Sequence, residues 1–476
     1  MNVIPKPKQA TYCSHGFLIN SASRKRIGKI LVFRNLEMES TEHPSTDEKN
    51  NWVEVLVAGP DCCIYRVPQY LRKLNKEAYT PRLVSIGPLH HGRKELLHME
   101  NQKKSCWSNF VGRVNAQKLK EVDTYIKSEE QRIRAHYSVP SDLQSSDYIT
   151  MIKHDAFFII EFFKGGINRS FHCYHQIVHD LLIDLLLLEN QLPYYVLNDL
   201  YIIVYPSERS SFFDLSIRYI GVIFDILKRG RFSTQPKVKH FTDLLRAGLL
   251  KDVQLTNLEP RDEEVDDLPS ATKFDEEVDD LPSDLPSATK LNESGLKFRG
   301  ITDKCFLDIS LVNRKCCKWL PFSEVDAVQI PRIKISDNTE TFFRNLMALE
   351  VFHYPDQTYI CNYVDLMDYL IDTVKDVDLL VEKEIIVNCV GDNEAIAKMF
   401  NKLCSHILPS PSCYHGITKE LREHYKNQCC HLKATLRSVY FSNLWTGTAT
   451  IAAALLVFLT LIQAVCSIMQ IIQGYT

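Results

Sequence analysis

The chain has 476 residues, of which 45% are hydrophobic and 24% are charged, and its formal net charge is −3. This composition is typical of a globular protein and excludes a wholly disordered or fibrous chain. The near-neutral charge argues against a dedicated nucleic-acid-binding protein, which usually carries a basic excess. We therefore expect a folded body large enough for two or three domains, with no nucleic acid among its partners.

Residues 1–50 predict a poorly ordered N-terminal extension. They carry mixed charge and weak hydrophobic periodicity, and they lack the apolar core of a secretory signal peptide. Met38 opens a stretch that would be a natural start for the chain. One hypothesis is therefore that residues 1–37 are an extension or a gene-model artefact, which peptide mass spectrometry would test.

The chain contains fifteen cysteines, including the adjacent pairs Cys62-Cys63, Cys316-Cys317 and Cys429-Cys430. An odd number at wide spacing in a long chain does not suggest a disulfide scaffold. No CxxC pair is followed by a second one, so the spacing of a structural zinc site is missing. We predict thiols that are buried as small apolar side chains in a reducing compartment.

Two apolar segments predict core helices in the N-terminal half of the body, residues 51–258. Residues 151–163 are strongly apolar. Residues 176–189 carry polar side chains at Gln176, Asp180 and Asp184, once per helical turn, and the remaining positions are almost all apolar. This pattern predicts a largely buried helix with a narrow solvent-exposed stripe, ending shortly before Pro193.

Residues 259–290 predict a disordered acidic linker. The sequence DEEVDDLPS occurs at 262–270 and again at 275–283, and LPSATK occurs at 268–273 and at 285–290. Clustered carboxylates repel one another, and repeated Leu-Pro steps break helices. A calcium site is the alternative, but the EF-hand spacing with its central glycine is absent.

The C-terminal half of the body, residues 291–445, predicts short strands followed by helices. Residues 306–311 and 330–335 alternate between apolar and polar side chains, as a strand does. Helices are predicted over 339–350, with Thr339 as the cap, over 363–374, and over 393–403, with Glu394 near the start. The expected fold class is mainly α: a helical globular body with a few short strands, plus one C-terminal transmembrane helix.

Residues 446–472 predict the transmembrane helix. No Asp, Glu, Lys or Arg follows Arg437, and residues 449–472 exceed the roughly 20 apolar residues that cross a bilayer as a helix. The membrane lipid bilayer is therefore the expected partner of residues 449–472.

Lys426, Lys433 and Arg437 lie on the N-terminal side of this segment. The positive-inside rule then places the body in the cytosol, on a single-pass anchor in a membrane that the sequence does not identify. The competing topology places the body outside the cell. Two N-x-[ST] sequons, at Asn168 and Asn292, are too common a pattern to decide.

The sequence contains no GxSxG, GxxxxGK[ST] or GxGxxG motif. We accordingly assign no catalytic, cofactor-binding or metal-binding residues. The adjacent His90 and His91, with Cys62, Cys63 and Cys106 nearby in sequence, are the candidate metal ligands. Adjacent side chains diverge, and glycines bracket the pair, so we favour structural loop histidines.

His179, Asp180 and Glu189 are the candidate acid–base set, because histidine titrates near neutrality. The alternative, which we favour, is that they form caps and hydrogen bonds within a helical core. Asp155 lies in an apolar segment and would need a partner if it is buried.

Arg66, Arg72 and Lys103 are the cations that could pair with Asp155, and the sequence does not choose between them. Residues 390–393 form a turn before a predicted helix. They are either an anion site or an ordinary helix entry.

Short motifs link most of the chain to a known family. IYRVP lies at 64–68, VSIGP at 84–88 and HHG at 90–92 within a dense block over residues 62–104. DAFFI at 155–159, HDLL at 179–182, LENQLP at 188–193, FLDI at 306–309 and FRNLMA at 343–348 follow in order. The combination resembles the plant DUF247 family, also called UPF0481, over roughly residues 52–472.

The resemblance implies a plant membrane-associated protein with one C-terminal span and no established enzymatic activity. Some grass members of the family are associated with self-incompatibility, but nothing in these residues identifies this chain as one of them. The acidic duplication and the N-terminal extension depart from the family pattern.

We expect a membrane-tethered, non-enzymatic protein that acts in recognition or signalling through a protein partner of unknown identity. The alternative is a membrane-bound enzyme of unknown reaction that uses His179, Asp180 and nearby carboxylates. A third hypothesis is an adaptor whose acidic linker docks a basic partner.

Overall fold

The computed structural model describes residues 59–165, 175–223, 232, 234–251, 285–302, 304–312, 327–405, 412–427 and 444–473. The N-terminal extension and residues 259–284 of the expected linker, with the calcium alternative, lie outside the described residues. Both predicted halves of the body belong to one compact unit with one continuous hydrophobic core.

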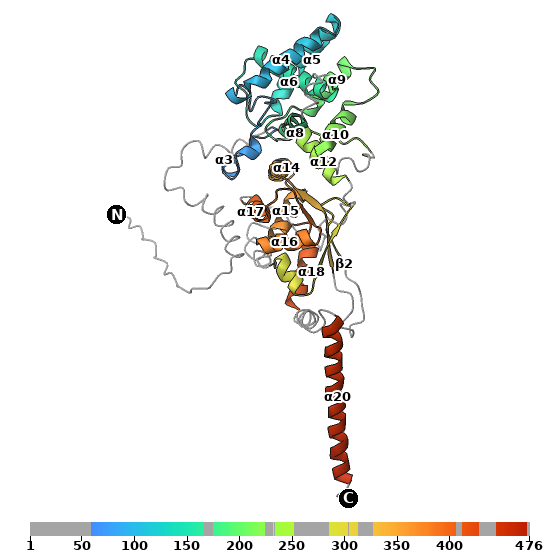
Figure 1. Cartoon of the computed structure of the whole chain (residues 1–476). Coiled ribbons are helices and arrows are strands. Elements are labelled where there is room, and N and C mark those ends of the chain that lie inside the picture. Colours follow the sequence, from blue (N-terminus) through green and yellow to red (C-terminus); the bar gives the residue numbers. More distant parts are fainter. Residues whose placement is uncertain are drawn as a thin grey trace, which may run out of the picture. The chain divides into compact units, whose positions relative to one another are not determined.

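The N-terminal half is built from helices (Figure 1). Their bounds are α3 Gln69–Arg72, α4 Leu97–Val111, α5 Ala116–Ala135, α6 Ser145–Phe163, α8 His175–Asp184, α9 Tyr194–Val204, α10 Phe212–Ile223 and α12 Phe241–Leu250, with short 3-10 turns η1 Glu77–Tyr79 and η2 Lys94–Leu96.

Helix α6 forms the centre of this half. Its residues from Ala156 to Phe163 are all buried, and it packs against α4, α5, α9 and α10. The core helix predicted over 151–163 is confirmed, with six more residues at its start. Helix α5 is amphipathic by contrast, because only Val122, Ile126, Glu130 and Ile133 are buried along its 20 residues.

Helix α8 is shorter than the periodicity predicts, and fewer of its polar side chains are exposed to solvent. It ends at Asp184, and residues 185–193 continue as a buried turn. Gln176 is exposed and Asp180 is half-buried, as the predicted solvent-exposed stripe requires. Asp184 is buried, so the prediction that it belongs to this stripe is wrong. The reason is that the loop of residues 82–84 covers this position, and its backbone N–H groups supply hydrogen bonds in place of water.

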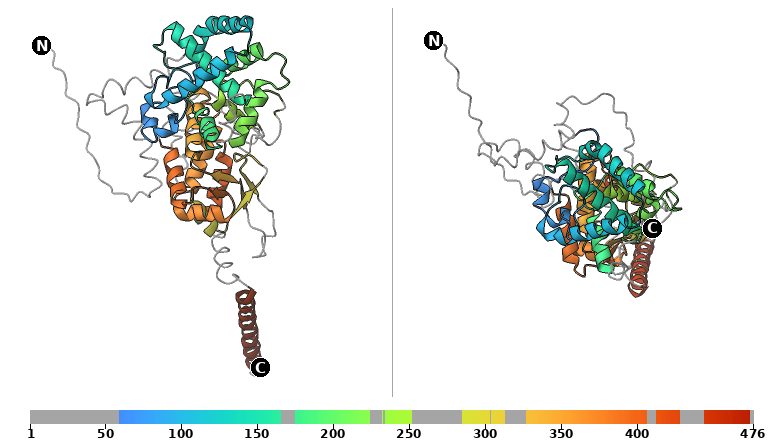
Figure 2. Two further views of the ribbon diagram at one scale, coloured as in Figure 1. Left: turned by 45° about the horizontal axis from the view of Figure 1, so that its top comes forward. Right: turned by 90° about the horizontal axis from the view of Figure 1, so that it is seen from above.

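The C-terminal half combines short strands with helices. The elements are α13 Ala288–Glu293, β1 Lys297–Ile301, β2 Ser310–Val312, β3 Ala327–Pro331, β4 Ile333–Ile335, α14 Thr339–His353, α15 Tyr359–Leu370, α16 Val374–Glu382, β5 Ile386–Asn388, α17 Asn393–Leu403 and α18 His415–Lys426. Figure 2 shows the strands beside the helices of this half. The mainly α fold class is confirmed.

Residues 285–290 belong to this half and not to a disordered linker. Leu285 and Ser287 are buried, and α13 begins at Ala288. Thr289 N–H donates to Asp376 Oδ1 at 2.8 Å. The second LPSATK copy therefore packs in the body, and the expected linker ends no later than residue 284 in the structure.

The strands form two small sheets. In the first, β1 pairs with β3 in parallel and β2 pairs with β3 antiparallel; in the second, β4 pairs with β5 in parallel. The strand predicted over 330–335 is present but divided at Arg332, where the chain leaves one sheet for the other.

The strand predicted over 306–311 is mostly wrong. Residues 306–309 form a turn, and strand pairing begins only at Ser310. Phe306, Leu307 and Ile309 are nevertheless buried. The alternating pattern indicates that this segment has buried side chains. A hydrogen-bonded turn can bury them as well as a strand can, so the pattern alone does not identify a strand.

The helices after the strands follow the predictions more closely. Helix α17 has the predicted bounds, 393–403. Helix α14 begins at Thr339, but the cap position is Asn338, while Thr339 Oγ1 accepts a hydrogen bond from Ser336 N–H at 2.8 Å. The helix predicted over 363–374 is shifted, because α15 runs from Tyr359 to Leu370 and α16 begins at Val374.

Helix α14 joins the two halves. It contacts η1 and α12 of the N-terminal half and α15 and α17 of the C-terminal half (Figure 1). Its buried Asn345 donates hydrogen bonds to Ala78 O and Thr341 O, both at 2.7 Å, and accepts one from Leu188 N–H at 2.8 Å. A single side chain of α14 thus stabilises two separate turns of the N-terminal half.

The last described element is α20, Leu444–Gln473. Its segment Thr448–Gln470 is long and apolar enough to cross a membrane, and none of that segment is buried. The predicted C-terminal helix of spanning length is therefore present.

Candidate functional site

The buried turn of residues 188–193 carries three polar side chains that are almost inaccessible to solvent. Asn190 Oδ1 accepts from Ile86 N–H at 2.7 Å, and Asn190 Nδ2 donates to Val84 O at 3.0 Å. Gln191 Nε2 donates to Leu185 O and Leu187 O, while its Oε1 accepts from Phe241 N–H at 2.9 Å. These side chains supply the hydrogen bonds that a buried irregular backbone would otherwise lack.

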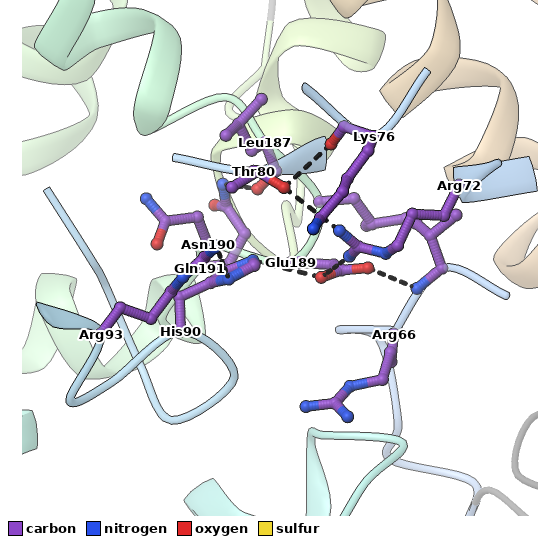
Figure 3. A network of polar contacts seen from close by, with 12 residues as sticks. Arg66, Arg72, Lys76, Thr80, His90, Arg93, Leu187, Glu189, Asn190 and Gln191 are labelled. Carbon is purple, nitrogen blue, oxygen red and sulfur yellow. Dashed lines mark hydrogen bonds and ion pairs between the residues drawn. The ribbon is translucent and has the colours of Figure 1, made fainter. Parts of the chain in front are cut away.

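Glu189 in the same turn lies at the centre of a charged network (Figure 3). Its carboxylate pairs with the Arg72 guanidinium, lies 3.1 Å from His90 Nε2 and accepts from Val67 N–H at 2.7 Å. Complete burial opposes ionisation, but the hydrogen bond from His90 and the charge of Arg72 outweigh it and lower the pKa of Glu189. The carboxylate is thus ionised, with each oxygen occupied by partners from the chain itself.

A second buried pair lies between α4 and α6. Lys103 is fully buried, and its Nζ lies 2.6 Å from Asp155 Oδ1 and 2.5 Å from Glu100 Oε1, and also donates to Ser85 O. Asp155 Oδ2 accepts from Gly87 N–H at 2.8 Å. Of the three candidate cations for Asp155, the structure therefore selects Lys103, while Arg72 pairs with Glu189 and Arg66 is exposed (Figure 3).

Asp184 completes the set of buried carboxylates that face residues 82–92. It accepts hydrogen bonds from the backbone N–H groups of Arg82, Leu83 and Val84 at 2.7–2.9 Å. Burial raises the pKa of Asp184 to about 6, against the three donors that favour the charged form. Both of its oxygens are occupied by backbone N–H groups, whereas Glu189 is bound by one backbone N–H and two side chains.

Residues 82–92 are therefore fastened at successive points by buried side chains of other segments. Asp184 binds residues 82–84, Asn190 binds residue 86, Asp155 binds residue 87 and Glu189 binds residue 90. We name these four side chains the clamp. The arrangement fixes the conformation of this loop.

The comparisons with known proteins agree with the motifs in this region. The model of a family described as "Plant protein of unknown function", DUF247, matches residues 64–459. The chain belongs to the DUF247 family. It is 27% identical over 436 residues to the UPF0481 protein At3g47200 of Arabidopsis thaliana, covering 86% of this chain and 87% of that one.

A second Arabidopsis thaliana relative, At3g02645, also carries UPF0481 in its name. It is 23% identical over 523 residues, covering 91% of this chain and 93% of the relative. No solved structure matches the chain. The family has no assigned function, so the chemistry of this DUF247 chain must be argued from its own residues.

The candidate acid–base set is only partly brought together. His179 Nδ1 lies 3.8 Å from Asp180 Oδ1, and both side chains are more than a third exposed on α8. Glu189 pairs instead with Arg72 and His90. The sequence reasoning missed His90 as the partner of Glu189, because the two residues are 99 positions apart.

The candidate metal ligands do not converge in the described part of the chain. His90 faces Glu189, the backbone oxygen of Cys63 lies 3.0 Å from His240 Nε2, and the Cys106 thiol contacts Phe157 O. Among the described residues, no group of three or more His, Cys, Asp or Glu side chains is placed to hold a metal ion. Cys62 and Cys63 are buried, and burial raises the pKa of the Cys62 thiol to about 11, which leaves it protonated and inert.

The turn at residues 390–393 is an ordinary helix entry. Asn388 Oδ1 accepts from Val390 N–H and Gly391 N–H, both at 2.8 Å, and Asp392 caps α17 by accepting from Glu394 N–H. An anion at this turn would need free backbone N–H groups. Those of Val390, Gly391 and Glu394 already donate to side chains of the protein, so the turn does not support an anion site.

Gly87 is the position in the clamped loop where a side chain does not fit. Its φ is +71°, and an added Cβ would lie 2.5 Å from Gln191 O and 2.8 Å from Tyr137 Oη. We expect Gly87→Ala to lower the free energy of unfolding by about 2–3 kcal/mol. Gly92 is the matched control, because its φ is +78° but its Cβ would meet nothing within 4 Å.

Gly92→Ala should cost only the backbone strain, about 1 kcal/mol. Urea unfolding of both variants of the full chain in detergent, followed by tryptophan fluorescence, measures the difference. Equal losses for the two variants would contradict the close packing of residue 87 against the 188–193 turn.

His240 at the start of α12 was not singled out from the sequence. It is fully buried, its Nδ1 accepts from Asp243 N–H at 3.3 Å as the helix cap, and its Nε2 lies 3.0 Å from Cys63 O. Burial lowers the pKa of His240 to about 4. A buried polar residue between apolar segments must find partners, which is the sequence signal that could have identified it.

The depressed pKa of His240 predicts a stability change with pH. Between pH 6.5 and pH 4 the unfolded chain binds a proton at this residue and the folded chain does not, so stability falls as the pH falls through this window. From pH 7.5 to pH 5 the loss at this residue is about 2 kcal/mol.

His240→Asn retains a cap but does not titrate, and this variant should lose correspondingly less stability over the same interval. The test compares urea unfolding of the two proteins at pH 7.5 and pH 5. Identical pH dependence in the two proteins would exclude the neutral buried state of His240.

Proposed function

We propose that this DUF247 chain is a membrane-anchored, non-enzymatic protein that acts in recognition or signalling through a protein partner. The observation that carries the proposal is α20, whose segment Thr448–Gln470 is of spanning length and apolar, with no part of it buried against the body. A helix of this kind is stable in hydrocarbon because all its backbone hydrogen bonds are internal. Exposed to water it would present a long apolar surface.

The chemistry of the body supports the non-enzymatic part of the proposal. The buried carboxylates of Asp155, Asp184 and Glu189 are each engaged by backbone N–H groups or cations of the chain. A catalytic carboxylate needs a position within hydrogen-bond reach of a substrate. The clamp instead uses these groups to fix the loop of residues 82–92.

The alternative of a membrane-bound enzyme has one contact in its favour, the approach of His90 Nε2 to Glu189 Oε2. The side chains of His90 and Glu189 are only 6% and 2% exposed. A substrate would have to displace buried chain to reach this pair, so we place the function in the surface of the body and not in this network.

We propose that the body faces the cytosol, and the basic residues Lys426, Lys433 and Arg437 on the N-terminal side of the span support this orientation. Protease treatment of sealed microsomes tests it. We expect the body to be degraded on intact vesicles; a protected body would place it on the lumenal or outer face. Epitope tags at both ends serve as the internal control.

The partner is tested by affinity capture of the full chain from native plant membranes in mild detergent. A protein that is captured reproducibly by the chain, and lost when exposed body side chains are substituted, would support the recognition role. Turnover of a small molecule that depends on His90 and Glu189 would favour the enzyme instead.

A further inference from the structure

Gln463, Cys466 and Gln470 of the span α20 lie on one face, with Thr460 and Ser467 beside it and Thr450 on the opposite face. Counting at the heptad spacing of two parallel packed helices, one seam passes through Ala449, Ala452, Leu456, Leu459, Gln463, Cys466 and Gln470. The opposite face of the same stretch presents Leu461, Val465 and Ile468. Both glutamines of the segment Thr448–Gln470 lie on this seam.

Gln463 is the polar group on this seam that its own helix does not satisfy. Thr460 Oγ1 donates to Val457 O at 2.8 Å, and Ser467 Oγ donates to Gln463 O at 2.9 Å, so both hydroxyls bond to carbonyls of α20. In the described part of α20, the carboxamide of Gln463 makes no hydrogen bond and the residue is exposed. In hydrocarbon, an unpaired amide costs several kcal/mol.

The depth of Gln463 makes this cost unavoidable. Thr448–Gln470 is centred on Leu459, and four further residues at 1.5 Å each place Gln463 about 6 Å from the middle of the span. The hydrocarbon core extends about 15 Å on each side of its midplane, so the side chain lies well within it. Gln470, by contrast, lies at the end of the segment, where the polar interface begins.

We propose that α20 self-associates as a parallel pair of identical helices, with the Gln463 carboxamides of the two copies hydrogen-bonded across the symmetry axis. This inference rests on the proposed membrane anchor. A second copy fits because a carboxamide is both donor and acceptor, so two of them satisfy each other.

Membrane insertion provides the register of this pair. Two copies of one chain enter the bilayer in the same direction, so their Gln463 residues lie at the same depth. Ala449 and Ala452 on the same seam allow close approach of the backbones at the other end of the span. A polar residue at one seam position fixes both register and pairing in the same way in soluble coiled coils.

The first experiment measures dimer dissociation of the full chain in detergent micelles by sedimentation equilibrium. Gln463→Leu should weaken the dimer about tenfold, whereas Gln463→Asn, which keeps a carboxamide, should remain close to the unchanged chain. Ala454→Leu, on the face away from the seam, should have little effect. A dimer that is lost on Ala454→Leu but unaffected by Gln463→Leu overturns the proposal.

The second experiment locates the interface through Cys466, which lies on the seam. In phosphatidylcholine vesicles, copper phenanthroline should oxidise the two Cys466 thiols of a pair to a disulfide, giving a dimer on a non-reducing gel. Cys466→Ser should remove that band, and Cys466→Ser combined with Val465→Cys should not restore it. Equal crosslinking at positions 465 and 466 overturns the assigned seam.

Alkaline extraction separates failure of this inference from failure of the anchor. A chain that stays in the membrane after carbonate treatment but is monomeric at every protein-to-lipid ratio overturns only the pairing. The partner of Gln463 would then be a helix of a different protein. A chain released by carbonate overturns the proposed anchor as well.

Discussion

Lys103→Met is expected to lower the free energy of unfolding by about 3–5 kcal/mol, because it leaves Asp155 buried and without its cation. Lys103 and Asp155 are 0% and 1% exposed at the side chain, and their charged atoms lie 2.6 Å apart. Complete burial already raises the pKa of Asp155 while Lys103 opposes the rise. Without Lys103 the carboxyl must either remain charged in the core or take up a proton.

The neighbouring residue provides the control for this prediction. Lys104 is exposed, so Lys104→Met should change the free energy of unfolding by less than about 0.5 kcal/mol. Adding Asp155→Asn to Lys103→Met should recover a large part of the loss, because the uncompensated charge is gone while an oxygen remains to accept from Gly87 N–H. Urea unfolding of the full chain in detergent measures all three; equal effects at positions 103 and 104 would contradict the structure.

Glu189→Gln is expected to lower the free energy of unfolding by about 3 kcal/mol. The substitution keeps an oxygen for Val67 N–H but removes the charge that the Arg72 guanidinium and His90 surround. The lowered pKa of Glu189 adds a pH signature. The folded chain releases this proton more readily than the unfolded chain, so the stabilisation is present above the unfolded pKa near 4.3 and is lost as the pH falls below it.

Glu95→Gln is the matched control for Glu189→Gln. Glu95 is 75% exposed and its distance to Arg93 is 3.9 Å, so the same change there should cost less than about 0.5 kcal/mol. Adding Arg72→Met to Glu189→Gln should restore part of the stability. If Glu189→Gln left stability unchanged but abolished an activity of the chain, the network would be an active site and not a clamp.

The helices that form the core could be predicted from the sequence, because the pattern of apolar residues within each segment shows which of its side chains are buried. The apolar run at 151–163 and the pattern at 393–403 were sufficient to place α6 and α17. The apolar segment of α20 was equally clear. In each case the helix period alone identifies the buried face or the span.

The clamp could not be predicted, because its partners are brought together only by the tertiary fold. Arg66, Arg72 and Lys103 are equally eligible partners of Asp155 in the sequence, because their distances from the carboxylate depend on the tertiary fold. Asp184 was assigned to a solvent-exposed stripe because periodicity describes one helix and not the loop that covers it. Asn345 was unnoticed in an apolar helix, although a polar side chain there needs buried partners.

Three of the candidate site residues make contacts that stabilise the fold. His90, Glu189 and Asp155 attract attention as titratable groups, yet in this fold they satisfy backbone amides and one another. Groups of this kind are needed wherever an irregular segment such as residues 82–92 is buried. Residue type alone does not distinguish this task from catalysis.

Alkaline carbonate extraction of plant membranes that contain the full chain tests the central claim most directly. The chain with unchanged α20 should remain in the membrane pellet. A variant with Leu459→Arg and Ile462→Arg should be released, because each charge near the middle of the span costs about 2.5–3.5 kcal/mol. Release of the unchanged chain, or equal retention of both proteins, would contradict a membrane anchor formed by α20.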